Sequence, residues 1–480
     1  MLLRNLISLP DYHMLENVDI TGVTSDSRKV RSGFLFVCVN GTKTDGHEFA
    51  RIAVELGAAV VLAACDTGVK NQIITPDTRK AYAMSCAAFF GNPAKALTLV
   101  GITGTKGKTT TSTLIKNILE AAGYKTGLIG TISKIVGEEE TPSKNTTPDA
   151  YELHETLRNM VEAGCTHCVM EVSSHALEQD RVYGLEFAVG VFTNLTHDHL
   201  DYHKTQENYR LQKSKLFSQT KQAVINIDDS EAWFMLSVCK CPVTTLSLKD
   251  ESADYLAKNI RFRPTGVDFE LLGVSVIGRV KFQTPGEFSV YNALTAGVCS
   301  LQLGVPFNTV IEALSQATGV KGRVELVPTG RDFTVIIDYA HNPESLQNVL
   351  SALNKYKTGR LITLFGCGGD RDRGKRPQMG KIAADHSDFV IVTSDNPRTE
   401  EPRVIIDDIL VGMEGTKTPF EVVENRVEAI QYAIKNARPE DMILLAGKGH
   451  ETYQEVNGIR NHMDEREIVA NALRTLAVES

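Results

Sequence analysis

The sequence predicts an α/β fold organised as three domains, and three observations support this prediction. The apolar run Leu97–Ile102 is followed by a glycine-rich loop ending in Lys108-Thr109, and a helical pattern then continues to Gly123. Residues 323–480 alternate β-rich runs with helical patterns, which indicates a doubly wound parallel sheet. A chain of 480 residues is too long to fold around a single hydrophobic core, which indicates more than one domain. We therefore expect an N-terminal α/β domain (1–96), a central P-loop domain with a parallel sheet (97–322) and a C-terminal Rossmann-like domain (323–480).

The first block, residues 1–96, contains two apolar runs and two helical patterns in alternation. It ends at the turn-forming sequence Gly91-Asn-Pro93. The predicted elements are a strand at Leu35–Val39, a helix at Glu48–Leu56, a strand at Ala58–Ala63 and a helix that opens at Pro76-Asp77. This pattern indicates a small α/β domain.

The second block opens with the strand–loop–helix context that a phosphate-binding loop requires. Glycines allow backbone N–H groups to point at phosphate oxygens, and the start of the helix adds a partial positive charge. The Lys108 ammonium can reach the outer phosphates, and the Thr109 hydroxyl can bind Mg²⁺. An ordinary turn is the alternative, which the flanking strand and helix disfavour. The predicted nucleotide-binding residues here are Gly104, Thr105, Lys106, Gly107, Lys108, Thr109 and Thr110.

The rest of this block continues the alternation of strands and helices. A helix is predicted at Pro148–Ala163, with Thr147 as its N-cap and Pro148 in its first turn. A later helical segment places Tyr209 and Lys213 on one face, four residues apart. The block ends near the small, polar stretch Gly319–Arg323, where we expect a hinge.

A candidate metal site follows two of the predicted central strands. Glu171 lies near the end of the strand Cys168–Ser173, and the strand Val189–Leu195 leads into a segment with His197, Asp198 and His199. Mg²⁺ prefers oxygen ligands, so carboxylates beside a P-loop favour magnesium. Zinc is the competing interpretation, and a solvated polar loop is a further alternative for the histidine segment. A ligand set without cysteine makes zinc the weaker choice.

The third block has four predicted strands, and a polar or glycine-rich segment follows each one. The strands are Thr334–Ile337, Leu361–Phe365, Phe389–Thr393 and Met442–Ala446. In open α/β sheets ligands bind outside the carboxyl ends of the strands. The four segments at these ends therefore predict one binding face, made by Asp338–His341, Gly366–Arg371, Asp395–Arg398 and Gly447–Glu451.

Composition excludes several classes of protein. The formal net charge of −8 argues against a nucleic-acid-binding protein. No apolar run approaches the roughly 20 residues that span a bilayer, so we expect a cytoplasmic protein without a membrane partner. The nine cysteines are scattered in mostly apolar runs, which indicates buried thiols in a reducing compartment. Cys165-Thr-His-Cys168 has a redox or zinc spacing, but no second pair lies at zinc-site distance.

Several motifs, spread over all three blocks in order, carry a family resemblance. They are Thr103–Thr110, Glu171–His175, Thr193–Leu195 with Asp198-His199, Tyr291–Ala293, Gly322–Glu325, Asp338–Pro343 and Gly447–Glu451. Together they resemble the Mur ligases of peptidoglycan synthesis. Thr24–Arg28, Asp45–His47 and Asp395–Arg398 narrow the resemblance to the member that adds the third residue of the stem peptide. Lys106 departs from the family, in which many relatives carry Asn, but backbone N–H groups still cradle the phosphates.

The resemblance implies an ATP-dependent carboxylate–amine ligase. ATP phosphorylates the D-Glu carboxylate of UDP-MurNAc-L-Ala-D-Glu, and the amine of meso-2,6-diaminopimelate attacks the acyl phosphate. An amide, ADP and phosphate result. The implied cofactors are ATP and Mg²⁺, the implied role is in cell wall synthesis, and we expect a monomer.

The resemblance also implies roles for individual residues. Lys108, His199 and a carbamylated Lys213 are the implied catalytic residues. Thr109 and Glu171 hold one Mg²⁺, and His199 and Lys213 hold the second; Asn292, Arg323 and Asp338 position ATP. The UDP-MurNAc-dipeptide contacts Ser27, Asn145, Thr146, Thr147, Ser173, Gln179 and Arg181. Diaminopimelate contacts Arg371, Asp395, Asn396, Pro397, Arg398, Gly447 and Glu451.

Three alternative functions stay open from the sequence. The same reaction can use L-lysine as the amine, and the fork of Arg398 beside Asp395 favours diaminopimelate instead, because it complements a second ammonium–carboxylate centre. A folyl-polyglutamate or cyanophycin type of amide ligase is disfavoured by the N-terminal block and by Asp395–Arg398. A non-catalytic nucleotide-binding scaffold is the third alternative, and ATP turnover distinguishes it.

Overall fold

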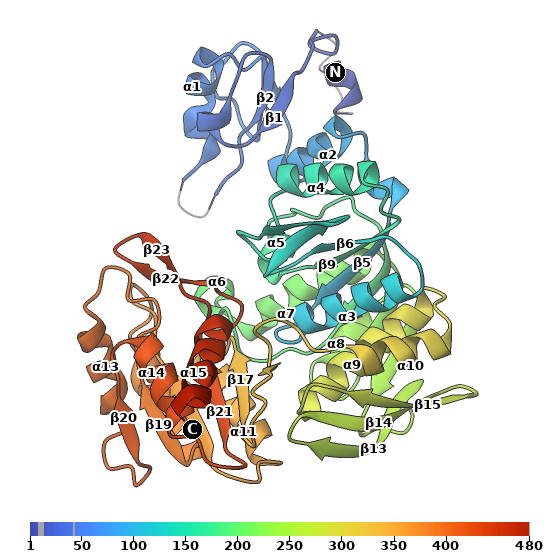
Figure 1. Cartoon of the computed structure of the whole chain (residues 1–480). Helices are drawn as coiled ribbons and strands as arrows, with labels where there is room; N and C mark the ends of the chain where they lie inside the picture. Colours follow the sequence, from blue (N-terminus) through green and yellow to red (C-terminus); the bar gives the residue numbers. More distant parts are fainter. Residues whose placement is uncertain (8–13, 42–43, 480) are drawn as a thin grey trace. The chain divides into compact units, whose positions relative to one another are not determined.

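The structure is a computed structural model that describes residues 1–7, 14–41 and 44–479 (Figure 1). Two compact units make up the chain. The first contains residues 1–256, 272–276 and 292–313, and the second contains residues 257–271, 277–291 and 314–480. The domain boundaries predicted after residues 96 and 322 stay predictions.

A four-stranded parallel sheet forms near the N-terminus, in the order β1-β2-β3-β4. The predicted strands correspond to β2 and β3, and the predicted helices to α1 and α2. Helix α2 begins after Asp77, whose carboxylate accepts a hydrogen bond from the Lys80 backbone N–H (3.1 Å). The bounds are β1 Gly22–Thr24, β2 Phe34–Val37, β3 Val60–Ala63, β4 Gln72–Ile74, α1 Ala50–Glu55 and α2 Thr78–Phe89.

Both faces of this small sheet are covered. Leu35 and Val37 belong to the same core cluster as Tyr82 of α2, whereas Phe36 belongs to a cluster with Ala53 of α1. Because successive side chains of a strand point to opposite faces, the continuous apolar run of β2 serves both cores.

An eleven-stranded sheet has the order β15-β14-β13-β12-β11-β10-β5-β9-β6-β7-β8. The P-loop strand β5 lies between β10 and β9 and is parallel to both. The strands are β5 Thr98–Thr103, β6 Thr126–Ile129, β7 Ser133–Val136, β8 Glu139–Pro142, β9 His167–Glu171, β10 Phe187–Phe192, β11 Thr220–Asn226, β12 Val243–Ser247, β13 Tyr255–Arg263, β14 Gly266–Gly273 and β15 Val276–Phe282.

The helices of this part include the three that were predicted, α3, α4 and α7. Helices α2 and α4 lie side by side (Figure 1). The helices are α3 Lys108–Ala121, α4 Ala150–Glu162, α5 Ser174–Glu178, α6 Leu200–His203, α7 Gln206–Ser214, α8 Ala232–Val238, α9 Glu287–Gln302 and α10 Phe307–Gln316.

The predicted N-cap of α4 was wrong. Asp149, not Thr147, caps this helix, because the Asp149 carboxylate accepts a hydrogen bond from the Glu152 backbone N–H (3.0 Å). The Thr147 hydroxyl donates instead to the backbone carbonyl oxygen of Glu171 (2.8 Å). Thr147 therefore connects the start of α4 to the end of β9.

A six-stranded sheet has the order β16-β17-β21-β18-β19-β20. All neighbours are parallel except β16 and β17. The four predicted strands are β17 Thr334–Asp338, β18 Leu361–Phe365, β19 Phe389–Val392 and β21 Met442–Ala446. The remaining elements are β16 Glu325–Val327, β20 Phe420–Val422, a separate hairpin of β22 Tyr453–Val456 and β23 Ile459–His462, and the helices α11 Pro343–Asn354, α12 Lys375–His386, α13 Pro402–Val411, α14 Arg426–Lys435 and α15 Glu465–Glu479.

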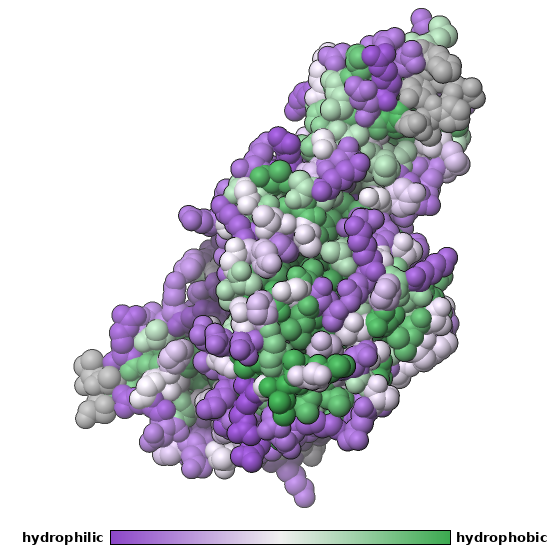
Figure 2. Space-filling model, turned by 90° about the vertical axis from the view of Figure 1, so that its right-hand side faces the viewer, coloured by the Kyte–Doolittle hydropathy of each residue, from purple (hydrophilic) through white to green (hydrophobic). Residues whose placement is uncertain are grey.

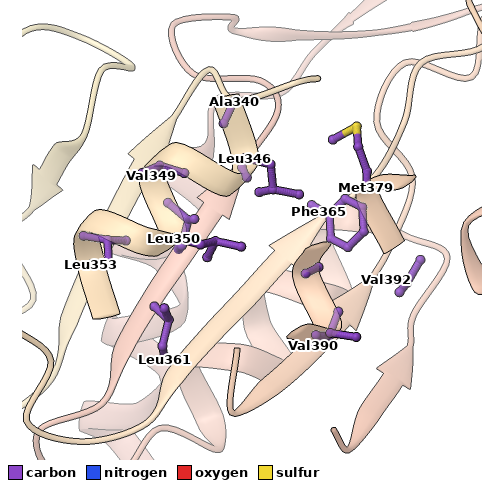
Figure 3. Packing of buried hydrophobic residues seen from close by; sticks show 14 of the residues in the cluster. Ala340, Leu346, Val349, Leu350, Leu353, Leu361, Phe365, Met379, Val390 and Val392 are labelled. Carbon is purple, nitrogen blue, oxygen red and sulfur yellow. The ribbon is translucent and has the colours of Figure 1, made fainter. Parts of the chain in front are cut away.

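Helices cover both faces of the six-stranded sheet. Figure 3 shows one face, where Leu346 of α11 and Met379 of α12 lie beside Phe365 of β18, and Leu350 of α11 belongs to the same cluster. On the other face, Ile430 of α14 packs in a cluster with Leu445 of β21. A sheet covered on both faces requires apolar strands without alternation, as in the fully buried β18 and β21. This confirms the doubly wound fold.

The prediction of buried thiols holds for six of the nine cysteines. Cys165 and Cys168 are buried free thiols, which confirms that they are core residues. The prediction was wrong for Cys65, which is exposed beyond the end of β3, and for the partly exposed Cys239 and Cys241. Hydrophilic side chains are spread over the face shown in Figure 2. Among the described residues, no helix has both the length and the apolar character needed to cross a bilayer.

Candidate active site

The loop between β5 and α3 has the geometry of a phosphate cradle. Gly104 and Gly107 have positive φ values of 150° and 84°. A Cβ atom on Gly104 would lie 1.9 Å from the Thr193 hydroxyl oxygen, and one on Gly107 would lie 2.4 Å from the Asn292 Oδ1. Only glycine fits at these two positions. The predicted strand–loop–helix arrangement is therefore confirmed, and Asn292 lies beside the loop.

The end of β10 holds the loop in place. The Asn194 carbonyl oxygen accepts from the Thr105 N–H (2.8 Å), and the Asn194 Oδ1 accepts from the Lys106 N–H (2.9 Å). The Thr193 hydroxyl donates to the Lys106 carbonyl oxygen (2.8 Å). Lys106 is thus held through its backbone N–H and carbonyl groups. Asn194 was not among the predicted site residues.

The Lys108 side chain folds back onto the loop that precedes it. Its Nζ donates to the carbonyl oxygens of Gly104 and Thr105, each at 2.9 Å. Lys108 is the first residue of α3, and Thr109 and Thr110 follow it in the first turn. A cation and a helix N-terminus therefore lie at the same loop, and this combination binds phosphate.

The buried Glu171 carboxylate lies beside the P-loop hydroxyl. It accepts hydrogen bonds from the Thr109 hydroxyl (3.1 Å), the Thr131 N–H (2.8 Å) and the Thr131 hydroxyl (2.9 Å). The Thr146 hydroxyl lies 3.0 Å from that of Thr131. Oxygen donors of this kind next to a phosphate loop suit Mg²⁺. The structure therefore brings the predicted pair Thr109 and Glu171 together.

Lys213 is almost completely buried behind the loop. Its Nζ donates to the Gly104 carbonyl oxygen (2.7 Å) and lies 4.5 Å from the centroid of the Tyr209 ring, on the same face of α7 as predicted. Burial, followed by the nearby Lys108 charge, holds the pKa of Lys213 well below its usual value. A lowered pKa favours the neutral amine.

His199 lies among other rings rather than in an assembled metal site. It has a positive φ of 54° and its side chain is half exposed. Its ring centroid is 5.0 Å from that of His175 and 6.2 Å from that of Tyr209. Within the described ranges, no group of three or more His, Cys, Asp or Glu side chains could hold a metal ion. A second metal held by His199 and Lys213 stays a prediction.

Four of the predicted dipeptide-binding residues form one hydrogen-bonded group. The Arg181 Nη1 donates to the Thr147 carbonyl oxygen (2.8 Å), and its Nε and Nη2 donate to the Gln179 Oε1 (3.1 and 2.7 Å). The Ser173 hydroxyl lies 3.3 Å from that of Thr147. Burial lowers the pKa of Arg181. These contacts place the group beside the end of β9 and its residue Glu171.

A pocket of about 340 Å³ adjoins this group. Gln179 and Arg181 line it together with Arg79, Tyr82 and Asn40. Of the remaining predicted residues, Ser27 begins a short 3-10 helix after β1, and Asn145 is exposed before α4. Ser27 and Asn145 are not among the pocket-lining residues, although Ser25 is.

Two predicted nucleotide-binding residues lie in the second compact unit, around β17. The Arg323 guanidinium lies 4.8 Å from the centroid of the Tyr339 ring. The Asp338 Oδ2 accepts from the Val324 N–H (2.8 Å). Asp338 therefore holds the turn that follows Arg323, at the carboxyl end of β17.

The carboxyl ends of β19 and β21 meet in the second unit, as the sequence predicts. Asp395 and Asn396 are buried, and a Cβ on Gly447 would lie 2.7 Å from the Asp395 Oδ2. The Asn396 Nδ2 donates to the Glu451 Oε2 (2.9 Å). Arg398 has a positive φ of 53°, and its Nη1 donates to the Gly369 carbonyl oxygen (2.7 Å).

Pro397 and Arg371 belong to two loops that are bonded to each other. The Gly369 N–H donates to the Asn396 carbonyl oxygen (2.9 Å), and the Arg371 Nη1 donates to the Asp370 carbonyl oxygen (3.0 Å). A Cβ on Gly369 would lie 1.9 Å from the Pro397 carbonyl oxygen. The two loops therefore form one surface.

Sequence reasoning missed the residues that hold this surface together. Arg376 is buried and its guanidinium donates to both Glu400 oxygens (3.0 and 2.8 Å). The Gln454 Nε2 donates to the Asp395 carbonyl oxygen (2.8 Å), from the hairpin β22–β23. A signal for that hairpin existed, because Asn457-Gly458 favours a tight hairpin turn and both residues have positive φ.

Three domain models of one protein family match successive parts of the chain. "Mur ligase family, catalytic domain" matches residues 19–98, "Mur ligase middle domain" matches 102–300, and "Mur ligase, glutamate ligase domain" matches 322–449.

Similar proteins span nearly the whole chain. UDP-N-acetylmuramoyl-L-alanyl-D-glutamate--2,6-diaminopimelate ligase of Clostridium perfringens is 44% identical, with 98% of this chain and 99% of the relative covered. The enzyme of that name from Caldanaerobacter subterraneus is 46% identical, with 95% of each covered. A solved structure of an enzyme with this name is 32% identical, covers 99% of both chains and has a TM-score of 0.75. A MurF ligase from Thermotoga maritima in complex with ADP, 18% identical, covers 96% of this chain and 99% of its own, and shares the fold with a TM-score of 0.62.

Proposed function

Because the chain belongs to the Mur ligase family, we propose that it is an ATP-dependent ligase of peptidoglycan precursor synthesis. It joins the amine of meso-2,6-diaminopimelate to the D-Glu carboxylate of UDP-MurNAc-L-Ala-D-Glu through an acyl phosphate. The observation that carries the proposal is the pair of sites on one chain. A phosphate loop with its acidic partner lies in the first unit, and the loop surface of Asp395–Arg398 and Gly447–Glu451 lies in the second.

The phosphate loop supports the first half of this reaction. A carboxylate is a poor electrophile until it carries a good leaving group, which the phosphoryl group of ATP provides. Negative charge on the transferred phosphoryl group needs fixed positive charge in place before the reaction. Lys108 and the N-terminus of α3 supply this charge at the loop, and Asn292 adjoins it.

Magnesium fits the oxygen donors beside the loop. Thr109 and Glu171 would hold one Mg²⁺, which neutralises charge on the phosphate oxygens when bound. His199 and Lys213 would hold the second, with Lys213 as a carbamate. Formation of a carbamate requires a neutral amine, and burial favours that form of Lys213.

The substrates divide between the two units. The dipeptide precursor is assigned to the pocket group with Thr147, Ser173, Gln179 and Arg181, and to the flanking Ser27, Asn145 and Thr146. Diaminopimelate is assigned to Arg371, Asp395, Asn396, Pro397, Arg398, Gly447 and Glu451, and ATP also contacts Arg323 and Asp338. Because both ATP and a nucleotide-linked precursor are cytoplasmic metabolites, we assign the enzyme to the cytoplasm, as a monomer without a nucleic-acid or membrane partner.

An assay of the complete reaction tests the proposal. The purified protein with ATP, Mg²⁺, UDP-MurNAc-L-Ala-D-Glu and meso-diaminopimelate should release one ADP and one phosphate for each amide formed. Omission of either the precursor or the amino acid should abolish amide formation. ATP binding without any turnover would identify a nucleotide-binding scaffold and contradict the proposal. Turnover with a folate and glutamate would indicate the other type of amide ligase.

A further inference from the structure

Lys448 is a fully buried lysine for which the proposed reaction has no role. It lies in the loop after β21, within Gly447–Glu451, and its side chain has no exposed surface. A buried ammonium is costly unless several acceptors surround it. Its Nζ donates to the Asn396 Oδ1 (3.0 Å) and to the Glu451 Oε2 (3.0 Å), and it lies 5.5 Å from the centroid of the Tyr453 ring. The cation therefore joins two residues that we assign to the incoming amino acid.

The contact with Lys448 fixes the orientation of the Asn396 side-chain amide. Its Oδ1 accepts from Lys448 and from the Glu455 backbone N–H (2.9 Å), and its Nδ2 donates to Glu451. A flipped amide would place N–H groups against two donors and its oxygen against a carboxylate. Only one orientation is therefore compatible with these partners. In that orientation Nδ2 has a second N–H, and within the described residues the Nδ2 hydrogen bond goes to Glu451 alone.

Lys448 also forms a hydrogen bond with one oxygen of the Glu451 carboxylate. Oε2 accepts both from Asn396 (2.9 Å) and from Lys448 (3.0 Å). In the part of the chain that the structure describes, no hydrogen bond reaches Oε1, and the side chain is 14% exposed. Lys448 thus holds the carboxylate by one oxygen and leaves the other available.

The hairpin β22–β23 stabilises this arrangement from the other side. The Glu455 N–H of this hairpin donates the second hydrogen bond that the Asn396 Oδ1 accepts. The Glu455 carbonyl oxygen accepts from the Arg398 N–H (3.0 Å). The Asn457 N–H donates to the Arg398 carbonyl oxygen (2.8 Å). The hairpin therefore holds the backbone of Arg398, directly after Pro397, while Lys448 fixes the side chains of Asn396 and Glu451.

We propose that Lys448 is a positioning residue for the incoming amino acid. It holds one acceptor, the Glu451 Oε1, beside one donor, the second N–H of the Asn396 Nδ2. An acceptor beside a donor matches the ammonium and the carboxylate of a single amino-acid centre. This inference rests on the proposed ligase function, and it gives Lys448 no contact with substrate.

Two half-reactions separate the effect of Lys448 on the amino acid from its effect on the rest of the enzyme. Hydroxylamine attacks the acyl phosphate and forms a hydroxamate and phosphate, and it needs no amino-acid site. In Lys448→Met, a neutral side chain of similar length, the KM for meso-diaminopimelate should rise about 10–100-fold, because a displaced contact group costs up to about 10² in rate. The hydroxylamine reaction and the KM for ATP should stay within about twofold of wild type. The exposed Lys381→Met, in the same unit, is the matched control and should change neither.

A double-mutant cycle shows whether Lys448 acts through Glu451. If it does, Lys448→Met in a Glu451→Gln background should add less than about threefold to the KM of meso-diaminopimelate, because coupled neighbours are non-additive. Lys448→Arg, which keeps the charge, should recover part of the KM. An unchanged KM in Lys448→Met would overturn the proposal, and so would an equal loss of the hydroxylamine reaction. A wild-type enzyme without ligase activity would instead overturn the proposed function.

Discussion

The phosphate loop of the first unit and the amino-acid surface of the second unit are built in different ways. Residues 103–110 are contiguous, and backbone conformation at two glycines gives the loop its shape. The amino-acid surface combines loops from three strand ends, and buried charged side chains such as Lys448 and Arg376 hold those loops together. The loop of the first site is therefore one contiguous segment that distant residues hold in place, whereas the second site is itself assembled from loops far apart in the sequence.

This difference predicts different responses to mutation. At the phosphate loop, loss of one side chain should slow acyl-phosphate formation, and the reaction with every amine should slow with it. At the amino-acid surface, loss of one group should change the choice of amine and leave acyl-phosphate formation intact.

Lys108→Ala should lower the rate of acyl-phosphate formation about 10²–10³-fold, because it removes a fixed charge that stabilises the transition state. Hydroxylamine- and diaminopimelate-dependent ADP release should fall together. Lys116→Ala, on the same helix and paired with Glu120, serves as the control and should retain wild-type rates. Near-normal turnover in Lys108→Ala would contradict the assignment of the loop.

Lys213→Ala should lower the overall rate about 10²-fold, as loss of a ligand-shell group does at metal sites. Short-chain carboxylates should restore part of the activity if a carbamate on Lys213 supplies oxygen ligands. Mass spectrometry under native conditions with bicarbonate should show one added CO₂ in wild type and none in Lys213→Ala. The exposed Lys221→Ala should behave as wild type. Full activity in Lys213→Ala would remove Lys213 from the site.

Arg398→Ala should lower kcat/KM for meso-diaminopimelate about 10–100-fold, which corresponds to one charge-assisted contact. The hydroxylamine reaction should not change, in contrast to Lys108→Ala. Arg403→Ala, an exposed arginine paired with Asp407, is the matched control. An equal effect on both amines would mean that Arg398 only supports the fold.

Acid should weaken the amino-acid surface at Glu400. Hydrogen bonds from Arg376 lower the pKa of Glu400 to about 2. Because this folded-state value lies below the unfolded one, the stabilisation is present above about pH 4.5 and is lost as the pH falls toward 2. The ionised Glu400 carboxylate stabilises the folded state by on the order of 1–3 kcal/mol. Thermal melting between pH 5 and pH 3 should show a smaller decline for Glu400→Gln than for wild type, and parallel curves would contradict this role.

The sequence predicts the phosphate loop and the doubly wound sheet well, because both depend on local patterns. Strands β18 and β21 have the predicted bounds. Strands β1, β4, β16 and β20 were missed, since three residues give no periodic signal. The strands β13–β15 were also missed, because the expected alternation of strand and helix does not hold there.

The supports of both sites could not be predicted, because they join residues far apart in the sequence. Asn194 contacts Lys106 across 88 positions, and Lys448 contacts Asn396 across 52. Lys448 lies in a motif that the sequence did indicate, but its burial is a tertiary property. Arg376 and Glu400 appear in the sequence as ordinary surface charges, and only the packed loops show that Arg376 is fully buried.

The ratio of kcat/KM for meso-diaminopimelate and L-lysine, measured with wild-type enzyme, tests the account most directly. The two amino acids share a reactive end and a distal ammonium, and they differ only in the distal carboxylate, which L-lysine lacks. The Arg398 guanidinium is left without its carboxylate when L-lysine binds, and sites built for a polar group discriminate strongly against an analogue without it. The wild-type enzyme should prefer meso-diaminopimelate by at least about 10³-fold. Equal use of the two amino acids would contradict it.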